Sequence, residues 1–455
     1  MTPEVKKRIE QIRQGIVPDG YTKTRSEITP TTWTPACLGD IYTERKEPGN
    51  ESLPLLTVSI HSGVSDGELD EDELPKKVKR IEDKSQYKRA ATGDLVFNMM
   101  RAWQGAIGTV RTEGMVSPAY IVAKPNGKVH PPFMDYYMKA PRMVGMINRQ
   151  SYGVTDFRKR LYWDSFAPIP CVLPPVREQR KIAEILSTQD KAIELQERKI
   201  DELKRFKKGC LERMFPRKGQ KVPEKRFPGF TDDWEQRKLT EFVEFFSGLT
   251  YTPNDVQENG TLVLRSSNVS NGEVVDADNV YVNPQVVNSE NVKVGDIVVV
   301  VRNGSRSLIG KHAQIKAFMP NTVIGAFMTG IRSECPKFTN ALLNTSRFEE
   351  EIAMNMGATI NQITGYMFSK MEFKVPCLDE QKEIGEYFEN LDHLITLHQR
   401  KLEEMKKQKK ALMQLLLTGI VRVQGNRFCC DFRDDEERNA QNAVKGGESY
   451  GNESP

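Results

Sequence analysis

The sequence has no hydrophobic run long enough to cross a membrane. Its longest purely aliphatic run, Ile297 to Val301, has five residues, whereas a membrane-spanning helix needs about 20. The first residues, Met1 to Lys7, also lack the charged start and apolar stretch of a signal peptide. These absences predict a soluble, cytoplasmic protein that has no membrane partner.

A large excess of charge of one sign is also absent. The chain holds 66 basic and 62 acidic residues, which gives a formal net charge of +4. Any nucleic-acid binding must therefore come from local basic patches. With 455 residues, of which 38% are hydrophobic and 28% charged, the chain is too long for one core and predicts two to three domains.

Cysteine and histidine are few and scattered. The seven cysteines include no C-x-x-C pair, which favours a reducing compartment and free thiols over a disulfide framework. None of the five histidines pairs with an acid or a cysteine at a zinc-ligand spacing. We therefore expect no metal site.

The loops that catalysis on DNA requires are missing as well. An adenine methyltransferase needs Asn, Asp or Ser before Pro-Pro-aromatic, but the nearest match starts with His130 and is better interpreted as a turn. The stretch from Gly304 to Lys311 has the wrong spacing for a phosphate-binding loop. Glu44-Arg45-Lys46 and Glu197-Arg198-Lys199 lack a well-placed aspartate for nuclease chemistry. The sequence predicts no catalytic site in this chain.

An internal repeat is present instead. Residues 178–215 align without gaps on residues 380–417, with 13 identities in 38 positions, where chance would give two or three. At similar offsets Trp33 matches Trp234, and Gly93-Asp94 matches Gly295-Asp296. A near-constant offset of about 200 residues across many elements indicates a duplicated domain.

Both copies of the aligned stretch have the apolar period of a long helix with a heptad seam. Polar residues interrupt each seam at matching places, Gln196 with His398 and Lys207 with Lys409. Each rod would measure about 57 Å, and the two seams could pair as an antiparallel coiled coil or pack separately on their own domains. The apolar seam residues are Ile182, Leu186, Ile193, Ile200, Leu203, Met214, Ile384, Phe388, Leu391, Ile395, Leu402, Met405, Leu412 and Leu416.

The rest of the chain predicts two mixed α/β globules in an α+β fold. Strand-like runs include Leu53 to Ile60, Asp94 to Met99 and Asp296 to Val301, and prolines such as Pro174 and Pro376 precede the long helices. We divide the chain into a lead-in with an amphipathic helix (1–32), a first globule (33–176), a first helix (177–216), a linker (217–233), a second globule (234–378), a second helix (379–420) and a disordered tail (421–455).

This order of elements, with Arg226-Phe227-Pro228-Gly229-Phe230 before Trp234 and with Glu178-Gln179 and Glu380-Gln381 at the helix starts, resembles the specificity (S) subunit of type I restriction-modification systems. The resemblance covers nearly the whole chain before the tail. The spacing between proline and glutamate departs slightly from a strict Pro-x-Glu-Gln in both copies.

The resemblance implies a non-catalytic subunit with two target recognition domains that each read half of a bipartite duplex DNA site. The helices would form a spacer and a docking platform for methyltransferase (M) and restriction (R) subunits. S-adenosylmethionine, ATP and Mg²⁺ would belong to those partner subunits and not to this chain. An alternative from the residues alone is a coiled-coil scaffold that joins two protein-binding domains, and a standalone methyltransferase is the weakest alternative.

Base reading requires side chains such as Arg, Lys, Asn and Gln that can pair with base edges or phosphates. Each globule has such a set beyond its Gly-Asp turn, although ordinary solvated loop residues, and a core position for Trp103, are the alternative interpretation. The candidates are Arg101, Trp103, Gln104, Arg158, Lys159 and Arg160 in the first globule and Arg265, Asn268, Arg302, Asn303, Ser305 and Arg306 in the second.

Overall fold

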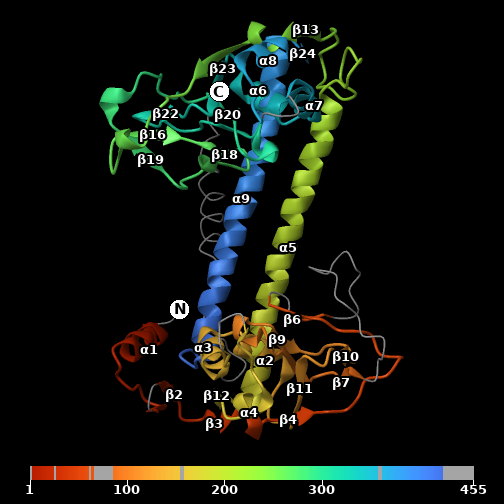
Figure 1. The fold of residues 1–455 in the computed structure, drawn as a ribbon, viewed down its shortest axis with the longest axis vertical. Helices are drawn as coiled ribbons and strands as arrows, with labels where there is room; N and C mark the ends of the chain where they lie inside the picture. The colour runs from red at the N-terminus through yellow and green to blue at the C-terminus, as the bar shows by residue number, and fades with distance from the viewer. Residues whose placement is uncertain are drawn as a thin grey trace, which may run out of the picture. The chain divides into compact units, whose positions relative to one another are not determined.

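A computed structural model describes residues 3–24, 27–60, 63–65, 86–153, 158–356 and 361–423. The chain divides into two compact units, Met1–Glu194 with Glu403–Pro455, and Leu195–Leu402. Each unit contains one mixed α/β domain, called domain 1 and domain 2 below, and part of each of the two long helices (Figure 1). The division between the units therefore falls inside the helices.

Each domain is built on a four-stranded antiparallel sheet with the same strand order. In domain 1 the order is β4 (Tyr42–Arg45), β11 (Tyr120–Pro125), β8 (Leu95–Asn98) and β9 (Ile107–Thr109). In domain 2 it is β14 (Val243–Ser247), β23 (Met328–Ser333), β20 (Ile297–Val300) and β21 (His312–Gln314). The equal topology matches the duplication that the sequence predicts, and buried strands β8 and β20 occupy equivalent places.

A two-stranded sheet in each domain joins its beginning to its end. The pairs are β3 (Thr34–Cys37) with β12 (Pro170–Leu173), and β13 (Glu235–Lys238) with β24 (Glu372–Val375). Domain 2 adds a sheet of β15 (Val256–Gln257), β19 (Val280–Val282), β16 (Thr261–Leu264) and β22 (Thr322–Ile324), in which β16 and β22 are parallel.

Four further pairs of short antiparallel strands are present among the described residues. They are β1 (Tyr21–Lys23) with β2 (Ile28–Pro30), β5 (Val58–Ser59) with β6 (Gly63–Val64), β7 (Lys88–Ala90) with β10 (Gly114–Val116), and β17 (Val269–Ser270) with β18 (Glu273–Val274). The strand predicted over Leu53 to Ile60 is much shorter in the structure. Only β5 forms there, and the residues before it make a single isolated bridge at Leu55.

Prolines start several of the helices, because a missing N–H costs nothing in the first turn. The helices are α1 (Pro3–Arg13), α2 (Pro131–Met138), α3 (Pro141–Gln150), α4 (Trp163–Phe166), α5 (Val176–Met214), α6 (Pro336–Leu343), α7 (Ser346–Asn355), α8 (Gly365–Lys370) and α9 (Leu378–Leu417). The stretch that begins at His130, expected to be a turn, instead starts a helix. His130 is its N-cap residue, and α2 follows directly. Among the described residues, no helix is long and apolar enough to cross a membrane.

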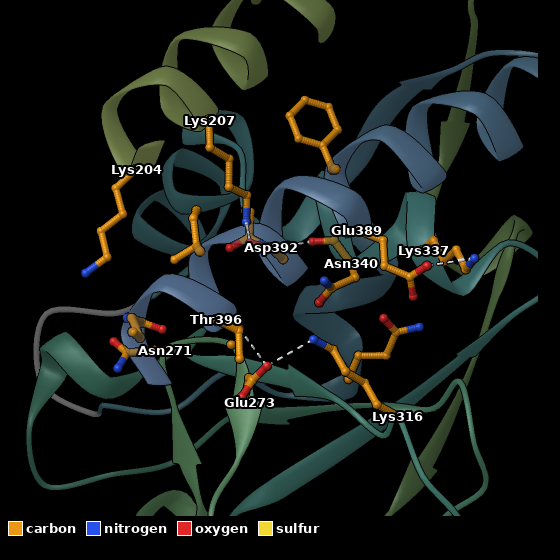
Figure 2. A pocket seen from close by; sticks show the side chains of 16 residues that line it. Lys204, Lys207, Asn271, Glu273, Lys316, Lys337, Asn340, Glu389, Asp392 and Thr396 are labelled. Atoms are coloured by element: carbon orange, nitrogen blue, oxygen red, sulfur yellow. Dashed lines mark hydrogen bonds and ion pairs between the residues drawn. The ribbon is translucent and has the colours of Figure 1, made fainter. Parts of the chain in front are cut away.

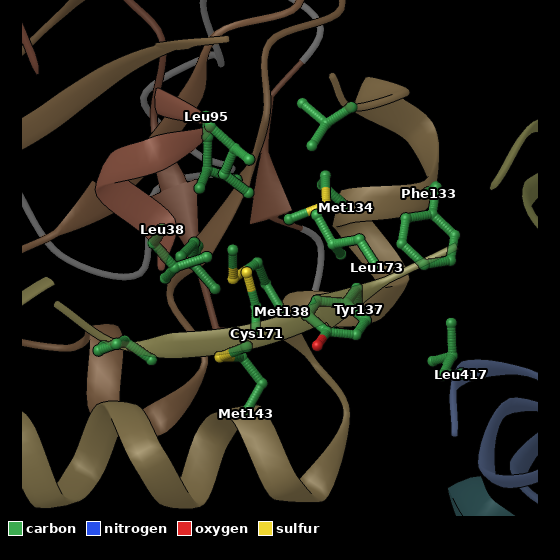
Figure 3. Close-up of a cluster of buried hydrophobic side chains, with 14 of the residues drawn as sticks. Leu38, Leu95, Phe133, Met134, Tyr137, Met138, Met143, Cys171, Leu173 and Leu417 are labelled. Carbon is green, nitrogen blue, oxygen red and sulfur yellow. The ribbon is translucent and has the colours of Figure 1, made fainter. Parts of the chain in front are cut away.

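The core of domain 1 draws on segments far apart in the sequence. Phe133, Met134 and Met138 from α2 pack beside Leu173 of β12, and Leu417 at the end of α9 contributes to the same cluster (Figure 3). Val5 of α1 is buried there as well, which matches the apolar face predicted for this helix. The first and last described segments of the chain therefore belong to one core.

The predicted seam residues are all buried or half-buried. The outer turns, however, pack into the domain cores rather than along a simple interhelix seam. Ile182, Leu186 and Leu416 belong to the core of domain 1, and Ile384 and Phe388 to the core of domain 2. A heptad pattern cannot separate these two kinds of burial, because both require an apolar stripe on one face of the helix.

The boundary drawn at residue 421 for a disordered tail is wrong for its first three residues. Val421 and Val423 are buried in the core of domain 1, and Arg422 binds Glu178 at the start of α5. Residues 424–455, the remainder of the expected tail, lie outside the described residues.

Candidate nucleic-acid interface

The repeated glutamate at the start of each long helix is a structural residue. Glu178 is 5% exposed, and its carboxylate accepts a hydrogen bond from Trp33 Nε1 at 3.2 Å and two from the Arg422 guanidinium at 2.8 and 2.9 Å. A buried carboxylate needs this kind of compensation for its lost hydration. The contact fixes the segment after α9 onto the first turns of α5.

Domain 2 repeats the arrangement with its own residues. Glu380 is 1% exposed and accepts from Trp234 Nε1 at 3.1 Å and from Arg226 at 2.9 and 2.7 Å. Arg226 comes from the linker after α5, just as Arg422 follows α9. The glutamines beside these glutamates, Gln179 and Gln381, donate to the carbonyls of Pro174 and Pro376 respectively, both at 2.9 Å. The motif that carries the resemblance therefore locks each helix to the preceding strand.

The repeated Gly-Asp turns are structural for a similar reason. Gly93 and Gly295 have φ values of 91° and 96°, where a residue with a Cβ is strained. Asp94 accepts from Arg45 Nε at 2.6 Å, and the matching Asp296 accepts from Arg332 Nε at 2.9 Å. These two arginines are bound to buried carboxylates and are not available to a ligand.

Beyond the turns, one backbone hydrogen bond recurs in both domains. Leu161 N–H donates to Met99 O at 2.9 Å, and Ile363 N–H donates to Val301 O at 2.8 Å. It brings the segment before α4 or α8 beside the residues that follow the central strand. Each domain thus has, at the equivalent place, a surface that contains most of its predicted reading residues.

In domain 1 this surface joins the two predicted groups. Trp103 is half-buried on the core and donates from Nε1 to Met100 O at 3.0 Å. Lys159 places its ammonium 5.6 Å from the centre of the Trp103 ring, within cation–π range. The side chains of Arg101, Gln104, Arg158 and Arg160 are exposed. The structure therefore brings together all six residues predicted here.

Two aromatic residues that sequence reasoning missed extend this surface. Tyr152 is 59% exposed, its ring centre lies 5.5 Å from that of Tyr162, and its backbone exchanges hydrogen bonds of 3.1 and 2.9 Å with Arg160. An exposed Tyr152 supported by the half-buried Tyr162 next to arginines can pack against sugar or base faces. The spacing of ten residues between the tyrosines gave no signal, because the contact depends on the bridge at Arg160.

In domain 2 the corresponding surface centres on Arg302. Its guanidinium lies 5.1 Å from the centre of the Phe327 ring, and Phe327 is itself 56% exposed. Asn303 is half-buried and donates from Nδ2 to Ser266 Oγ at 3.1 Å, while Ser305 and Arg306 are exposed in the following loop. Phe327 was missed because it lies in a turn before β23 that has no recognisable motif.

The structure places Asn268, which the sequence suggested as a base reader, in the interior of domain 2. Asn268 is fully buried, its Oδ1 accepts from Arg265 N at 2.9 Å, and its Nδ2 donates to Ala277 O at 2.7 Å and to Asn279 Oδ1 at 2.9 Å. Arg265 is paired with Asp278 at 2.7 Å. Asn268 stabilises a loop, because a buried amide with satisfied hydrogen bonds has little to offer an additional partner.

The polar seam positions form ion pairs within each unit. Lys207 on α5 binds Asp392 on α9 at 2.6 Å in one unit, and Lys409 on α9 binds Asp190 on α5 in the other. Gln196 Nε2 lies 2.8 Å from His398 Nδ1 and donates to the His398 carbonyl at 2.8 Å. Asp190 and Asp392 occupy matching places in the sequence repeat, so the two ion pairs are repeated as well.

A polar cavity of about 200 Å³ lies between domain 2 and α9, beside the ion pair of Lys207 with Asp392 (Figure 2). Glu273 of β18 accepts from Thr396 on α9 at 3.0 Å and from Lys316 at 3.2 Å. Although partial burial opposes ionisation, these partners lower the pKa of the Glu273 carboxyl. Lys337 pairs with Glu389 on the far side. The contacts of Glu273 with Thr396 and of Lys337 with Glu389 therefore hold domain 2 against α9.

Among the described residues, no group of three or more His, Cys, Asp or Glu side chains could hold a metal ion. The described cysteines are all free thiols. His61, Cys429 and Cys430 lie outside the described residues.

Comparisons with known proteins agree with this organisation. The family model for the type I restriction modification DNA specificity domain matches residues 76–205 and 231–407. The type I restriction enzyme MjaVIII specificity subunit of Methanocaldococcus jannaschii is 27% identical over 308 residues, which cover 65% of this chain and 71% of the relative.

Two solved structures share the fold. One, from work on complex assembly and conformational transition of the type I R-M system, has a TM-score of 0.54 at 16% identity and covers 86% of this chain and 99% of its own. The other, a type I restriction-modification S subunit from M. genitalium, has a TM-score of 0.52 at 13% identity and covers 84% and 96%. At these identities the likeness concerns the fold alone.

Proposed function

Because this chain belongs to the specificity subunit family of type I restriction-modification systems, we propose that its two domains each read one half of a bipartite double-stranded DNA target. The observation that carries the proposal is the repeated backbone hydrogen bond at Leu161 and Ile363. It places exposed cationic side chains at the same site of both domains, which is what a protein with two similar DNA readers needs.

The charges of this surface differ from those elsewhere in the domains. Arg101, Arg160 and Arg306 are exposed, with no hydrogen bond or ion pair from their side chains to the rest of the described chain, whereas Arg45 and Arg332 are bound to buried carboxylates. An unpaired guanidinium can form a bidentate contact with guanine or with a phosphate. The proposed reading surface is therefore positively charged and accessible, whereas the side chain of Asn268 is buried beneath it.

The two long helices are proposed to pair as an antiparallel coiled coil that sets the gap between the half-sites. The repeated ion pairs of Lys207 and Lys409 and the contact of Gln196 with His398 support this arrangement. Polar seam contacts of this kind select one register and one orientation. The helix pair is also proposed as the docking platform for M and R subunits.

Catalysis is assigned to those partners. The M subunits would bind S-adenosylmethionine and methylate adenine N6, and the R subunit would use ATP and Mg²⁺ to translocate and cut DNA. This chain would supply only the choice of sequence, in the cytoplasm, where the DNA is.

The test is methylation mapping with reconstituted protein. The isolated chain should neither methylate nor cleave DNA, and addition of the M subunit should produce adenine methylation at one asymmetric, split sequence. Replacement of residues 33–170 by the recognition domain of a relative should change one half of that sequence and leave the other. Methylation by the isolated chain, or a change in both halves, would contradict the proposal.

A further inference from the structure

The proposed reading surfaces of the two domains share equivalent anchoring residues. Leu161 and Ile363 make the same hydrogen bond, to Met99 and Val301. Phe166 and Phe368, which follow them at equal distances in the sequence, are both fully buried, Phe166 at the end of α4 and Phe368 within α8. These anchors place the two segments in the same register, 202 residues apart.

In this register, Arg160 corresponds to Gln362. Each stands one residue before the anchored Leu161 or Ile363, so alternation along an extended chain directs its side chain to the opposite face from a buried apolar residue. Arg160 is exposed and Gln362 is half-exposed. Neither side chain forms a hydrogen bond or an ion pair with the rest of the described chain.

The backbone at both positions is held firmly. Arg160 is bridged to Tyr152 by two hydrogen bonds of 2.9 and 3.1 Å, and Gln362 is bridged to Arg302. Next to Gln362, Asn361 donates from Nδ2 to the Gly304 carbonyl at 3.1 Å. A side chain that reads a base must start from a fixed backbone, because small displacements break its bidentate geometry.

The two side chains differ in the base they match. The Arg guanidinium donates two hydrogen bonds to O6 and N7 of guanine, whereas the Gln amide donates and accepts, which fits N7 and N6 of adenine. We propose that residues 160 and 362 are equivalent base-reading positions, where Arg160 selects a guanine in one half-site and Gln362 an adenine in the other. This inference rests on the proposed function and assigns base reading at one position of each half-site to a single residue.

The experiment exchanges the two residues in the complete complex with its M subunit. Methylated motifs are mapped for the wild type and for Gln362→Arg and Arg160→Gln. Gln362→Arg should change the preferred base at one position of one half-site from adenine to guanine, and Arg160→Gln should make the reverse change in the other half-site. The expected change in discrimination at that position is on the order of tenfold to a hundredfold.

A matched control separates base reading from added charge. Gln285→Arg introduces the same charge at an exposed residue of the short turn after β19 and should leave the motif unchanged. Gln362→Ala serves if the arginine variant fails to fold, and it should relax discrimination at the same position. Such a change at one base pair is not expected from a structural role, which would weaken methylation of all sequences alike.

The possible failures are distinguishable. A wild-type complex that methylates a bipartite motif, together with folded variants that keep that motif or change it at several positions, would overturn this inference and leave the proposed function intact. A wild-type complex without a bipartite motif would overturn the proposed function itself.

Discussion

At the scale of single residues, the partner of a charged side chain decides what that side chain can do. Arg45 and Arg332 hold buried aspartates, and Arg226 and Arg422 hold buried glutamates. Removal of one member of such a pair leaves an uncompensated buried charge, which costs several kcal/mol. The exposed Arg302, whose guanidinium contacts the Phe327 ring and no acidic side chain among the described residues, is available to a ligand.

Arg302→Ala should therefore weaken DNA binding by about 1–3 kcal/mol if the guanidinium reads a guanine edge. A phosphate contact would instead weaken binding to all sequences alike and lower the dependence of affinity on salt. The measurement is affinity for target and non-target duplexes at several salt concentrations. Arg265→Ala, which removes an arginine already paired with Asp278, is the comparison variant and should lower affinity less than Arg302→Ala. Unaltered affinity and salt dependence in Arg302→Ala would remove it from the interface.

His312 makes the stability of domain 2 depend on pH. Burial on β21 lowers the pKa of its imidazole, and Nδ1 lies 3.0 Å from Gly310 O, with the Lys207 ammonium a further unfavourable charge. In the unfolded chain the His312 imidazole takes up a proton near pH 6.5, whereas in the folded chain its protonation requires a lower pH. The free energy of unfolding should therefore fall as pH drops below about 6.5, by at most about 1.4 kcal/mol per pH unit.

Thermal unfolding of the wild type and His312→Gln, compared from about pH 7.5 to 5.5, measures this contribution. The variant should lose part of the pH dependence. His393→Gln removes an exposed histidine from α9 and should behave as the wild type. Parallel pH profiles for the wild type and His312→Gln would show that His312 titrates equally in the folded and unfolded chains.

At the scale of elements, the two long helices differ in how closely other residues pack against a glycine in each of them. A Cβ on Gly385 of α9 would lie 2.7 Å from Phe338 N and 2.8 Å from Lys337 Cβ, so α6 packs directly on this glycine. A Cβ on Gly209 of α5 would meet no atom closer than Arg213 Nη2 at 4.0 Å. The same residue type thus has a packing role in one helix and none in the other.

Alanine substitutions should consequently have opposite effects. Gly385→Ala should lower the free energy of unfolding by about 1–3 kcal/mol, because the backbone of α6 must move. Gly209→Ala should raise it by up to about 1 kcal/mol, because alanine is the better helix former. Denaturant unfolding of both variants is the measurement. Stabilisation by Gly385→Ala would mean that α6 can withdraw without loss of packing.

At the scale of the whole molecule, the proposed spacer makes a prediction about the DNA target. Insertion of one heptad after Glu194 and one after Leu402 would lengthen both helices by about 10.5 Å and preserve the apolar seam. The unspecified gap in the target should then grow by up to about three base pairs, because duplex DNA rises about 3.4 Å per base pair. Both half-site sequences should stay the same.

Methylation mapping of the double insertion checks this length dependence. Insertion into one helix alone should put the Lys207–Asp392 and Lys409–Asp190 pairs out of register with each other and reduce folding, which makes it the control for register. A folded, active complex with the original gap would show that the helices do not set the distance between the readers.

The sequence alone was sufficient for the repeat, the two long helices and the family, because these depend on local periodicity and on identities at a constant offset. It also singled out the residues around Arg101 and Arg302 as candidate readers, because a conspicuous Gly-Asp turn marks the end of the preceding segment. Periodicity could not show that Ile182 and Phe388 are buried in domain cores, since the same apolar stripe serves either kind of packing.

Only the tertiary structure decided which polar residues are free to act. Asn268 and Arg302 are both plausible base readers in the sequence, yet one is buried with its amide satisfied and the other is exposed. The pairing of Arg422 with Glu178 and the correspondence of Arg160 with Gln362 likewise depend on contacts between distant segments. Hydrogen-bond satisfaction is a property of three-dimensional neighbours, and residue type and spacing do not determine it.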